Sequence, residues 1–342
     1  MACKVERDGE GSKEFAAMKP KLCIVGTNNS FRYKSIADSP AVKEKFDVEI
    51  TTEFKGNCDL AWTQTPFISS VFKKLKDWGG PYVLHVGGDV LTEFATLPDK
   101  LRSAVDTFRR SKKVICISRY LADLYTSKLG DDNFVGLKHG LWGCDHSDRG
   151  IVPSRFEKKI SWNIDSKPLI VMAITMSVEN KWRGLPLFLH AAGDLLEKMN
   201  VKVVCSGKKK SQHAVVEKLQ NQYRFFEFRW FGNEWPKLLS SADMFVHPSL
   251  FDGWPRSLAE AMCVGLPTIA YDVAGASEVS RTNILVDPRD SNALRAVLHD
   301  QLTNESSREK VGKANAVEAI RLTEKHRNDY ADLLVEILGE KT

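Results

Sequence analysis

The chain has 342 residues, of which 43% are hydrophobic and 27% are charged, and its formal net charge is +5. This length and composition are typical of a soluble globular chain with about two domains. The weak, evenly spread positive charge does not predict a nucleic acid partner, although it permits contact with phosphates or anionic lipid head groups.

Short apolar runs alternate with longer amphipathic runs along the chain, which predicts an α/β fold of parallel sheets covered by helices. Residues 1–20 are polar and charged, which predicts a loose tail and no signal peptide. The rhythm of strands and helices then runs as far as residue 137. The first half predicts strands at residues 22–25, 48–51, 60–63, 82–86, 114–118 and 134–137.

Residues 138–167 do not continue this alternation of strands and helices, because they form a polar stretch with several glycines and prolines. We expect a domain boundary there. Two Rossmann-like domains on either side would bind ligands at the carboxyl ends of their strands, across a cleft. The predicted units are a tail over 1–20, a first domain over 21–150, a linker over 151–167, a second domain over 168–322 and a C-terminal helix over 323–342. The second half predicts strands at residues 169–174, 201–205, 225–228, 244–246, 268–270 and 284–286, and a last helical segment at 330–338.

The most informative segment is HPSLFDGWPRSLAEAMCVGLPTIAYDVAGASE, at residues 247–278. A buried strand is followed by a loop, and a helix is expected to begin near Pro255 and to stop at the following Gly-Leu-Pro. In this arrangement the first N–H groups and the dipole of the helix point toward the loop, where an anion can bind. Asp252 in the loop and Glu260 about two turns inside the helix can face the same crevice.

The two acids could instead have a purely structural role. Arg256 lies four residues before Glu260, so the pair could form an exposed ion pair worth about 0.3 kcal/mol. The whole segment, however, resembles the donor-site signature of retaining GT-B glycosyltransferases of the family-four type, the glycosyl transferases group 1. That family usually has two glutamates separated by seven residues, and this chain has Asp252, one methylene shorter, in the first position.

The resemblance implies a GT-B fold of two Rossmann-like domains, with a C-terminal helix that crosses back to the first domain. It also implies separate roles for the two acids. Glu260 would bind the ribose of a nucleotide, and Asp252 would contact hydroxyls of the transferred sugar and stabilise an oxocarbenium-like state. Gly253, Trp254 and Pro255 are expected to contact the donor as well.

Positive partners for the diphosphate are expected in ITMSVENKWRGLPLFLHAAG, after the first strand of the second domain. Arg183 resembles the lysine of the family's Lys-Gly pair, and Lys181 supplies a second charge, which would stabilise the leaving diphosphate. Either residue could instead be an ordinary surface residue, and the family's upstream arginine is missing. The lysine run at residues 208–210 is more typical of a solvated face.

Two other segments resemble the family. In FRWFGNEWPKLLSSADMFVHPS, Phe231, Gly232 and Asn233 would contact the nucleotide base, largely through backbone groups. In LHVGGDVLTEF of the first domain, His85 is the candidate for a contact with the transferred sugar, although a lone histidine at a strand end is more often packed in a core. The loop GTNNSFRYKS lacks the spaced glycines of a dinucleotide fingerprint, which argues against an NAD enzyme.

The seven cysteines are odd in number, scattered and often within apolar runs. We therefore expect reduced core residues and a cytoplasmic location. No stretch has the apolar length of a membrane span, so any membrane contact is expected to be weak and peripheral.

The sequence predicts a glycosyltransferase that moves a sugar from a nucleotide-diphosphate donor to an unidentified hydroxyl acceptor, with retention at the anomeric carbon. No metal or other cofactor is expected, since there is no Asp-x-Asp motif and no Cys/His cluster with ligand spacing. One alternative is a catalytically weakened or non-catalytic homologue that keeps the fold and binds nucleotide, motivated by Asp252 and the missing arginine. Another is a different GT-B activity, such as a sugar-nucleotide epimerase or a phosphorylase.

Overall fold

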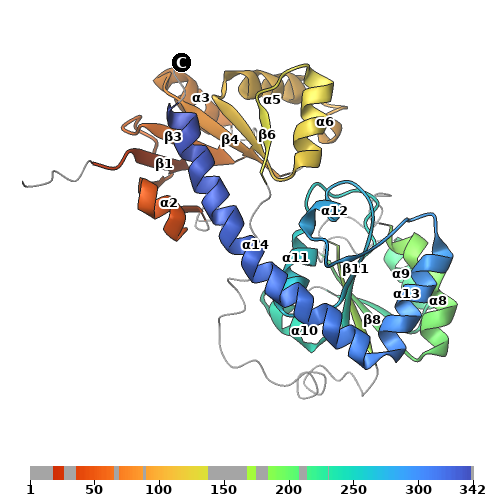
Figure 1. Cartoon of the computed structure of the whole chain (residues 1–342). Helices are drawn as coiled ribbons and strands as arrows, with labels where there is room; N and C mark the ends of the chain where they lie inside the picture. Colours follow the sequence, from red (N-terminus) through yellow and green to blue (C-terminus); the bar gives the residue numbers. More distant parts are fainter. Residues whose placement is uncertain are drawn as a thin grey trace, which may run out of the picture.

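A computed structural model describes residues 18–26, 36–64, 69–87, 90–137, 168–174, 184–207, 214–229 and 231–339. Within these ranges, two parallel sheets form the centres of two domains, and one long helix runs from the second domain to the first (Figure 1). The predicted α/β fold with two Rossmann-like domains is confirmed. Each predicted strand is present, with ends that differ by no more than about two residues from those expected.

The first sheet has the order β2-β1-β3-β4-β5-β6 in the part of the chain that the structure describes. Its central strands are buried on both faces, which is why they read as continuous apolar runs. The strands are β1 (Lys21–Val25), β2 (Asp47–Thr51), β3 (Leu60–Gln64), β4 (Tyr82–Val86), β5 (Lys113–Cys116) and β6 (Phe134–Gly136). The helices are α2 (Pro40–Lys45), α3 (Ser69–Trp78), α4 (Val90–Glu93), α5 (Pro98–Arg110) and α6 (Arg119–Leu129).

The second sheet has the order β12-β11-β10-β7-β8-β9, in which the strand order reverses between β7 and β10. Ligands of doubly wound sheets bind outside the carboxyl ends of the strands at such a switch point. The strands are β7 (Leu169–Ile174), β8 (Lys202–Gly207), β9 (Phe226–Arg229), β10 (Met244–His247), β11 (Thr268–Tyr271) and β12 (Ile284–Val286). The helices are α8 (Leu185–Lys198), α9 (Ala214–Gln222), η4 (Gly232–Glu234), α10 (Trp235–Ser241), α11 (Arg256–Cys263), α12 (Ala276–Val279) and α13 (Ser291–Thr303).

The last helix, α14 (Glu305–Gly339), packs on both domains. In the second domain, Asn315 Nδ2 donates to the carbonyl oxygen of Leu266 over 2.8 Å. In the first domain, Leu334 and Ile337 are buried against the face of the sheet that carries Trp62. The predicted crossing of the C-terminal helix back to the first domain is therefore present, and the helix begins well before residue 323.

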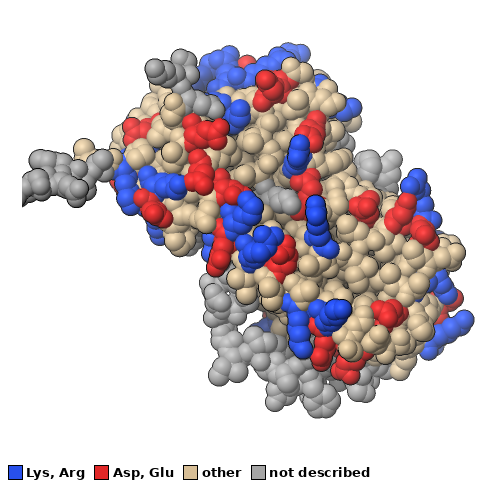
Figure 2. Space-filling model, viewed as in Figure 1, with Lys and Arg blue, Asp and Glu red and all other residues tan. Residues whose placement is uncertain are grey.

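Charged side chains of both signs are interspersed over the face of the molecule that shows the length of α14 (Figure 2). Several form surface ion pairs, such as Lys45 with Asp332 and Arg321 with Glu318. Exposed pairs of this kind contribute about 0–1 kcal/mol each. Among the described helices, none is both long and apolar enough to cross a membrane.

Four of the cysteines in the described ranges have free thiols, and the prediction of reduced residues holds for them. Burial raises the pKa of the Cys116 and Cys205 thiols, which lie in core strands. Cys263 is disulfide-bonded, so the prediction is wrong for this residue. Cys263 lies at the end of α11 and is only half-buried, unlike the core thiols. Cys3 and Cys144 fall outside the described residues.

Candidate functional site

The loop of residues 248–255, which joins β10 to α11, lies at the switch point of the second sheet. β10 pairs with β7 in parallel, with Phe245 opposite Val171, so the two strands end at the same edge. The chain just before α8 reaches this loop, because a Cβ on Gly184 would lie 1.9 Å from the carbonyl oxygen of Pro248. Gly184 also has a φ of +62°, which favours glycine. The start of α8 is therefore held against the β10–α11 loop.

Hydrogen bonds to nearby backbone groups fix the position of Asp252 in this loop. Its Oδ1 accepts a hydrogen bond from the backbone N–H of Trp254 over 3.1 Å, and its carbonyl oxygen accepts one from Gly275 over 2.9 Å. Aspartate commonly closes a turn in this way, through the backbone two residues on. Oδ2 lies 3.6 Å from Nε2 of His247, whose side chain is only 2% exposed, whereas that of Asp252 is 24% exposed. The carboxylate is thus fixed in position and still reaches solvent.

Glu260 lies on α11 with its side chain 18% exposed. Its Oε2 accepts a hydrogen bond of 2.8 Å from Nε1 of Trp235, at the start of α10. Its Oε1 lies 3.5 Å from Nε of Arg256, so the ion pair weighed as a structural explanation is present. Trp235 was not among the predicted site residues, although it lies two residues after the segment expected to contact the base. An indole N–H can only donate, so Trp235 fixes the carboxylate without neutralising it.

The residues between the two acids are mostly packed. A Cβ on Gly253 would lie 2.5 Å from Cδ1 of Leu121, on α6 of the first domain, so a larger residue would require the Leu121 side chain to shift. The Trp254 side chain is 5% exposed and contacts His326 of α14, with ring centroids 6.2 Å apart. Pro255 is buried and immediately precedes α11. The side chain of Trp254 therefore belongs to the core.

The segment expected to contact a base surrounds η4. Phe231 is buried, and the guanidinium of Arg229 lies 4.4 Å from the centroid of its ring. Gly232 begins η4 with a φ of +52°, and the backbone of Asn233 follows within it. The predicted contacts through backbone groups remain predictions, as does any role of the diphosphate partners Arg183 and Lys181, which lie outside the described residues.

His85 lies at the carboxyl end of β4 but is only 1% exposed. Its Nδ1 is 3.2 Å from the hydroxyl of Tyr330 on α14, and that hydroxyl accepts a hydrogen bond of 2.8 Å from Trp62 Nε1. Which of the two groups donates to the other depends on the tautomer of His85. Burial raises the pKa of Tyr330, and the hydrogen bond with Trp62 opposes this shift. The structure thus packs His85 in the core, and its contact with a sugar stays a prediction.

Replacing Tyr330 by phenylalanine should lower the free energy of unfolding by about 1–3 kcal/mol, because the buried indole N–H of Trp62 loses its acceptor. Urea denaturation of the wild type and of Tyr330→Phe measures this difference in the free energy of unfolding. Tyr223→Phe is a matched control, since the hydroxyl of Tyr223 has an exposed hydrogen bond with Gln222. Equal losses in the two variants would show that the buried contact does not stabilise the fold.

In the described part of the chain, no group of three or more His, Cys, Asp or Glu residues is placed to hold a metal ion. Residues 154–317 match the sequence model of the family Glycosyl transferases group 1. This match contains the β10–α11 loop, both acids and Trp235. The resemblance to this family is therefore confirmed for that segment, and with it the prediction of a glycosyltransferase domain.

Two curated relatives from Escherichia coli share part of the chain. A UDP-Gal:alpha-D-GlcNAc-diphosphoundecaprenol alpha-1,3-galactosyltransferase is 32% identical over 111 residues, which cover 30% of this chain and 29% of the relative. An O-antigen chain mannosyltransferase B is 33% identical over 75 residues, which cover 22% of this chain and 20% of the relative. The chain thus aligns with less than a third of the length of either relative.

The fold of almost the whole chain is similar to a solved structure. HepE from Anabaena, in complex with UDP and glucose, has a TM-score of 0.70 and 15% sequence identity. The similarity covers 93% of this chain and 100% of HepE. The GT-B architecture predicted from the sequence is confirmed by this likeness and by the two sheets.

Proposed function

We propose, on the premise that residues 154–317 form a glycosyl transferases group 1 domain within a GT-B fold, that this protein is a nucleotide-sugar-dependent glycosyltransferase. It would move a sugar from a nucleotide-diphosphate donor to a hydroxyl acceptor. The observation that supports this most is the position of Asp252 and Glu260 at the switch point between β7 and β10. Both carboxylates are fixed by neighbouring groups and remain partly exposed.

The donor is proposed to lie mainly on the second domain. Glu260 accepts hydrogen bonds from the ribose hydroxyls, in the orientation that Trp235 fixes. Asp252 contacts hydroxyls of the transferred sugar, and its negative charge stabilises the positive charge that develops on the ring during transfer. A preplaced charge of this kind requires no covalent bond to the enzyme.

The diphosphate is proposed to lie near the start of α8. This helix has 14 residues, and its positive dipole end lies against the β10–α11 loop through Gly184. A helix N-terminus favours the negative charge that grows on the leaving group. Arg183 and Lys181 would add positive charge at this end, and the leaving phosphate itself would accept the acceptor's proton. We propose that the reaction retains the anomeric configuration and requires no metal ion or cofactor.

The acceptor is proposed to bind from the side of the first domain. The strand order of the first sheet reverses between β1 and β3, so its own switch point lies there. The hydroxyl acceptor would thus approach the donor across the boundary of the two domains.

One observation favours a second candidate, a homologue that binds nucleotide without transfer. Asp252 has a short side chain, and one of its oxygens already accepts a hydrogen bond from Trp254. A carboxylate committed to a turn has less freedom to follow a reacting sugar. Both candidate functions predict nucleotide binding, but only the first predicts turnover of a nucleotide sugar.

The nucleotide that binds should raise the melting temperature, since a ligand at one hundred times its dissociation constant stabilises the folded state by about 2.7 kcal/mol. A thermal-shift screen with UDP, GDP, ADP and their sugars measures this. Glu260→Gln should lose most of the shift, because the amide lacks the charge that strengthens hydrogen bonds to ribose. Glu217→Gln, on the exposed face of α9, should keep it. If no nucleotide shifted the wild-type transition, the proposed function would be wrong.

A further inference from the structure

The two domains meet where α6 begins. Glu278, on α12 of the second domain, accepts two hydrogen bonds from backbone N–H groups of the first domain. Its Oε2 lies 2.9 Å from the nitrogen of Arg119, and its Oε1 lies 2.6 Å from that of Tyr120. The first N–H groups of a helix have no partner within the helix. A carboxylate of one domain therefore caps a helix of the other, and α6 and α12 face each other between the domains (Figure 1).

The same turn of α6 also contacts the β10–α11 loop. The ring of Tyr120 packs edge-on against Phe251, with centroids 5.9 Å apart and an interplanar angle of 68°. Leu121 occupies the space beside Gly253. Three successive residues of the first domain thus touch either Glu278 or the loop that carries Asp252.

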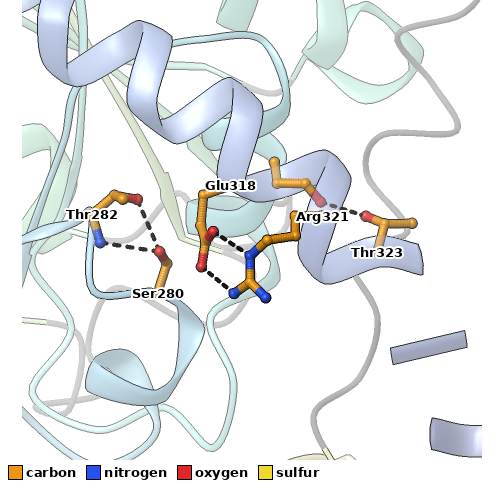
Figure 3. Close-up of polar contacts among 6 residues, drawn as sticks. Ser280, Thr282, Glu318, Arg321 and Thr323 are labelled. Atoms are coloured by element: carbon orange, nitrogen blue, oxygen red, sulfur yellow. Dashed lines mark hydrogen bonds and ion pairs between the residues drawn. The ribbon is translucent and has the colours of Figure 1, made fainter. Parts of the chain in front are cut away.

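Glu278 is itself joined to that loop. The backbone N–H of Gly275 donates to the carbonyl oxygen of Asp252, and a Cβ on Gly275 would lie 1.9 Å from the carbonyl oxygen of Gly253. After α12, Ser280 Oγ accepts a hydrogen bond of 3.1 Å from the backbone N–H of Thr282 and lies 2.8 Å from its hydroxyl, which closes a turn (Figure 3). The segment that carries Glu278 is therefore fixed on both sides.

We propose that Glu278 is a positioning residue that holds the first domain against the Asp252 loop and so sets the distance between acceptor and donor. Charge-assisted hydrogen bonds to a helix N-terminus suit this role, because both the bonds and the helix dipole favour the carboxylate. Interfaces between domains otherwise permit relative motion. The effect on transfer rests on the proposed function, whereas the contact itself does not.

Hydrogen exchange of the full chain tests the contact directly, with fragmentation that resolves single amides. In Glu278→Ala the amides of Arg119 and Tyr120 should exchange at least about tenfold faster than in the wild type, because they lose their acceptors. Amides of β4 should be unchanged. Glu278→Gln retains an acceptor oxygen and should give intermediate rates, and Glu217→Ala should match the wild type. Wild-type rates at both amides in Glu278→Ala would overturn the proposal.

Faster exchange of the β4 amides in Glu278→Ala would mean that this variant is destabilised as a whole. In that case Glu278→Gln would be used to test the contact. Selective faster exchange at residues 119 and 120 in Glu278→Gln supports the proposal, and its absence overturns it. Turnover of UDP-glucose, UDP-galactose and GDP-mannose then tests the positioning role. In Glu278→Ala, kcat should fall at least about tenfold while the Kd for UDP or GDP changes less than about twofold, with partial rescue in Glu278→Gln.

A fall in nucleotide affinity as large as the fall in kcat would overturn the positioning role. If the wild type turned over none of these sugars, the proposed function would fail in this assay. The exchange rates at Arg119 and Tyr120 would still decide whether Glu278 joins the domains.

Discussion

Replacing Asp252 by asparagine should lower the rate of sugar transfer by a factor of about 10²–10³, the loss seen when one preplaced electrostatic group is removed from an active site. Asparagine keeps an oxygen that can accept the hydrogen bond from Trp254, so the loop should retain its conformation. The substitution removes the negative charge that we propose stabilises the developing oxocarbenium ion. Release of nucleoside diphosphate from the donor measures the rate.

Asp290→Asn is the matched control for this substitution. Asp290 also accepts a backbone hydrogen bond through its side chain, from Ala293 at the start of α13, and the residue is exposed. Both variants should unfold at urea concentrations close to the wild-type midpoint, and only Asp252→Asn should lose activity. Transfer at the wild-type rate in Asp252→Asn would remove this residue from the mechanism.

Replacing Gly275 by alanine should both destabilise the protein and reduce transfer. The added Cβ would lie 1.9 Å from the carbonyl oxygen of Gly253 and 3.2 Å from that of Asp252, so backbone must move on one side or the other. Overpacking of this kind typically costs about 1–3 kcal/mol of unfolding free energy. Urea denaturation measures the loss of stability, and release of nucleoside diphosphate measures the loss of activity.

Gly339→Ala serves as the control for the added methyl group, because a Cβ at Gly339 would meet nothing within 4 Å. It should leave stability and activity close to those of the wild type. If Gly275→Ala behaved like Gly339→Ala in both measurements, the close approach of the α12 segment to the Asp252 loop would not matter to the protein.

Most strands could be predicted because they are short apolar runs bounded by polar residues, whereas β2 and β9 alternate apolar with charged residues. The start of α14 could not be predicted in the same way. Near the start of the helix, the buried residues are Gly312, Asn315 and Ala319, which are small or polar and produce no apolar stripe. Asn315 is buried because its amide donates to Leu266 and Thr268, a contact that hydrophobic periodicity does not detect.

The two acids of the site could be found from the sequence because they belong to one continuous motif. Their partners could not, since Trp235 lies 25 residues from Glu260, and Glu278 reaches N–H groups 158 and 159 residues away. The burial of His85 could not be predicted for the same reason, because its partner Tyr330 lies 245 residues further along the chain. The large apolar ring of Trp254 is buried in the core, and the expected contact of this residue with the donor stays a prediction.

Incubation of the wild-type protein with UDP-, GDP- and ADP-sugars, with water as surrogate acceptor, tests the proposed transfer most directly. Time-resolved NMR follows both the nucleotide and the anomeric proton. We expect one class of donor to release its nucleoside diphosphate, and the sugar first formed to keep the anomeric configuration of the donor. Nucleotide binding without any release would contradict transfer and leave a binding protein, whereas interconversion of intact nucleotide sugars would identify an epimerase.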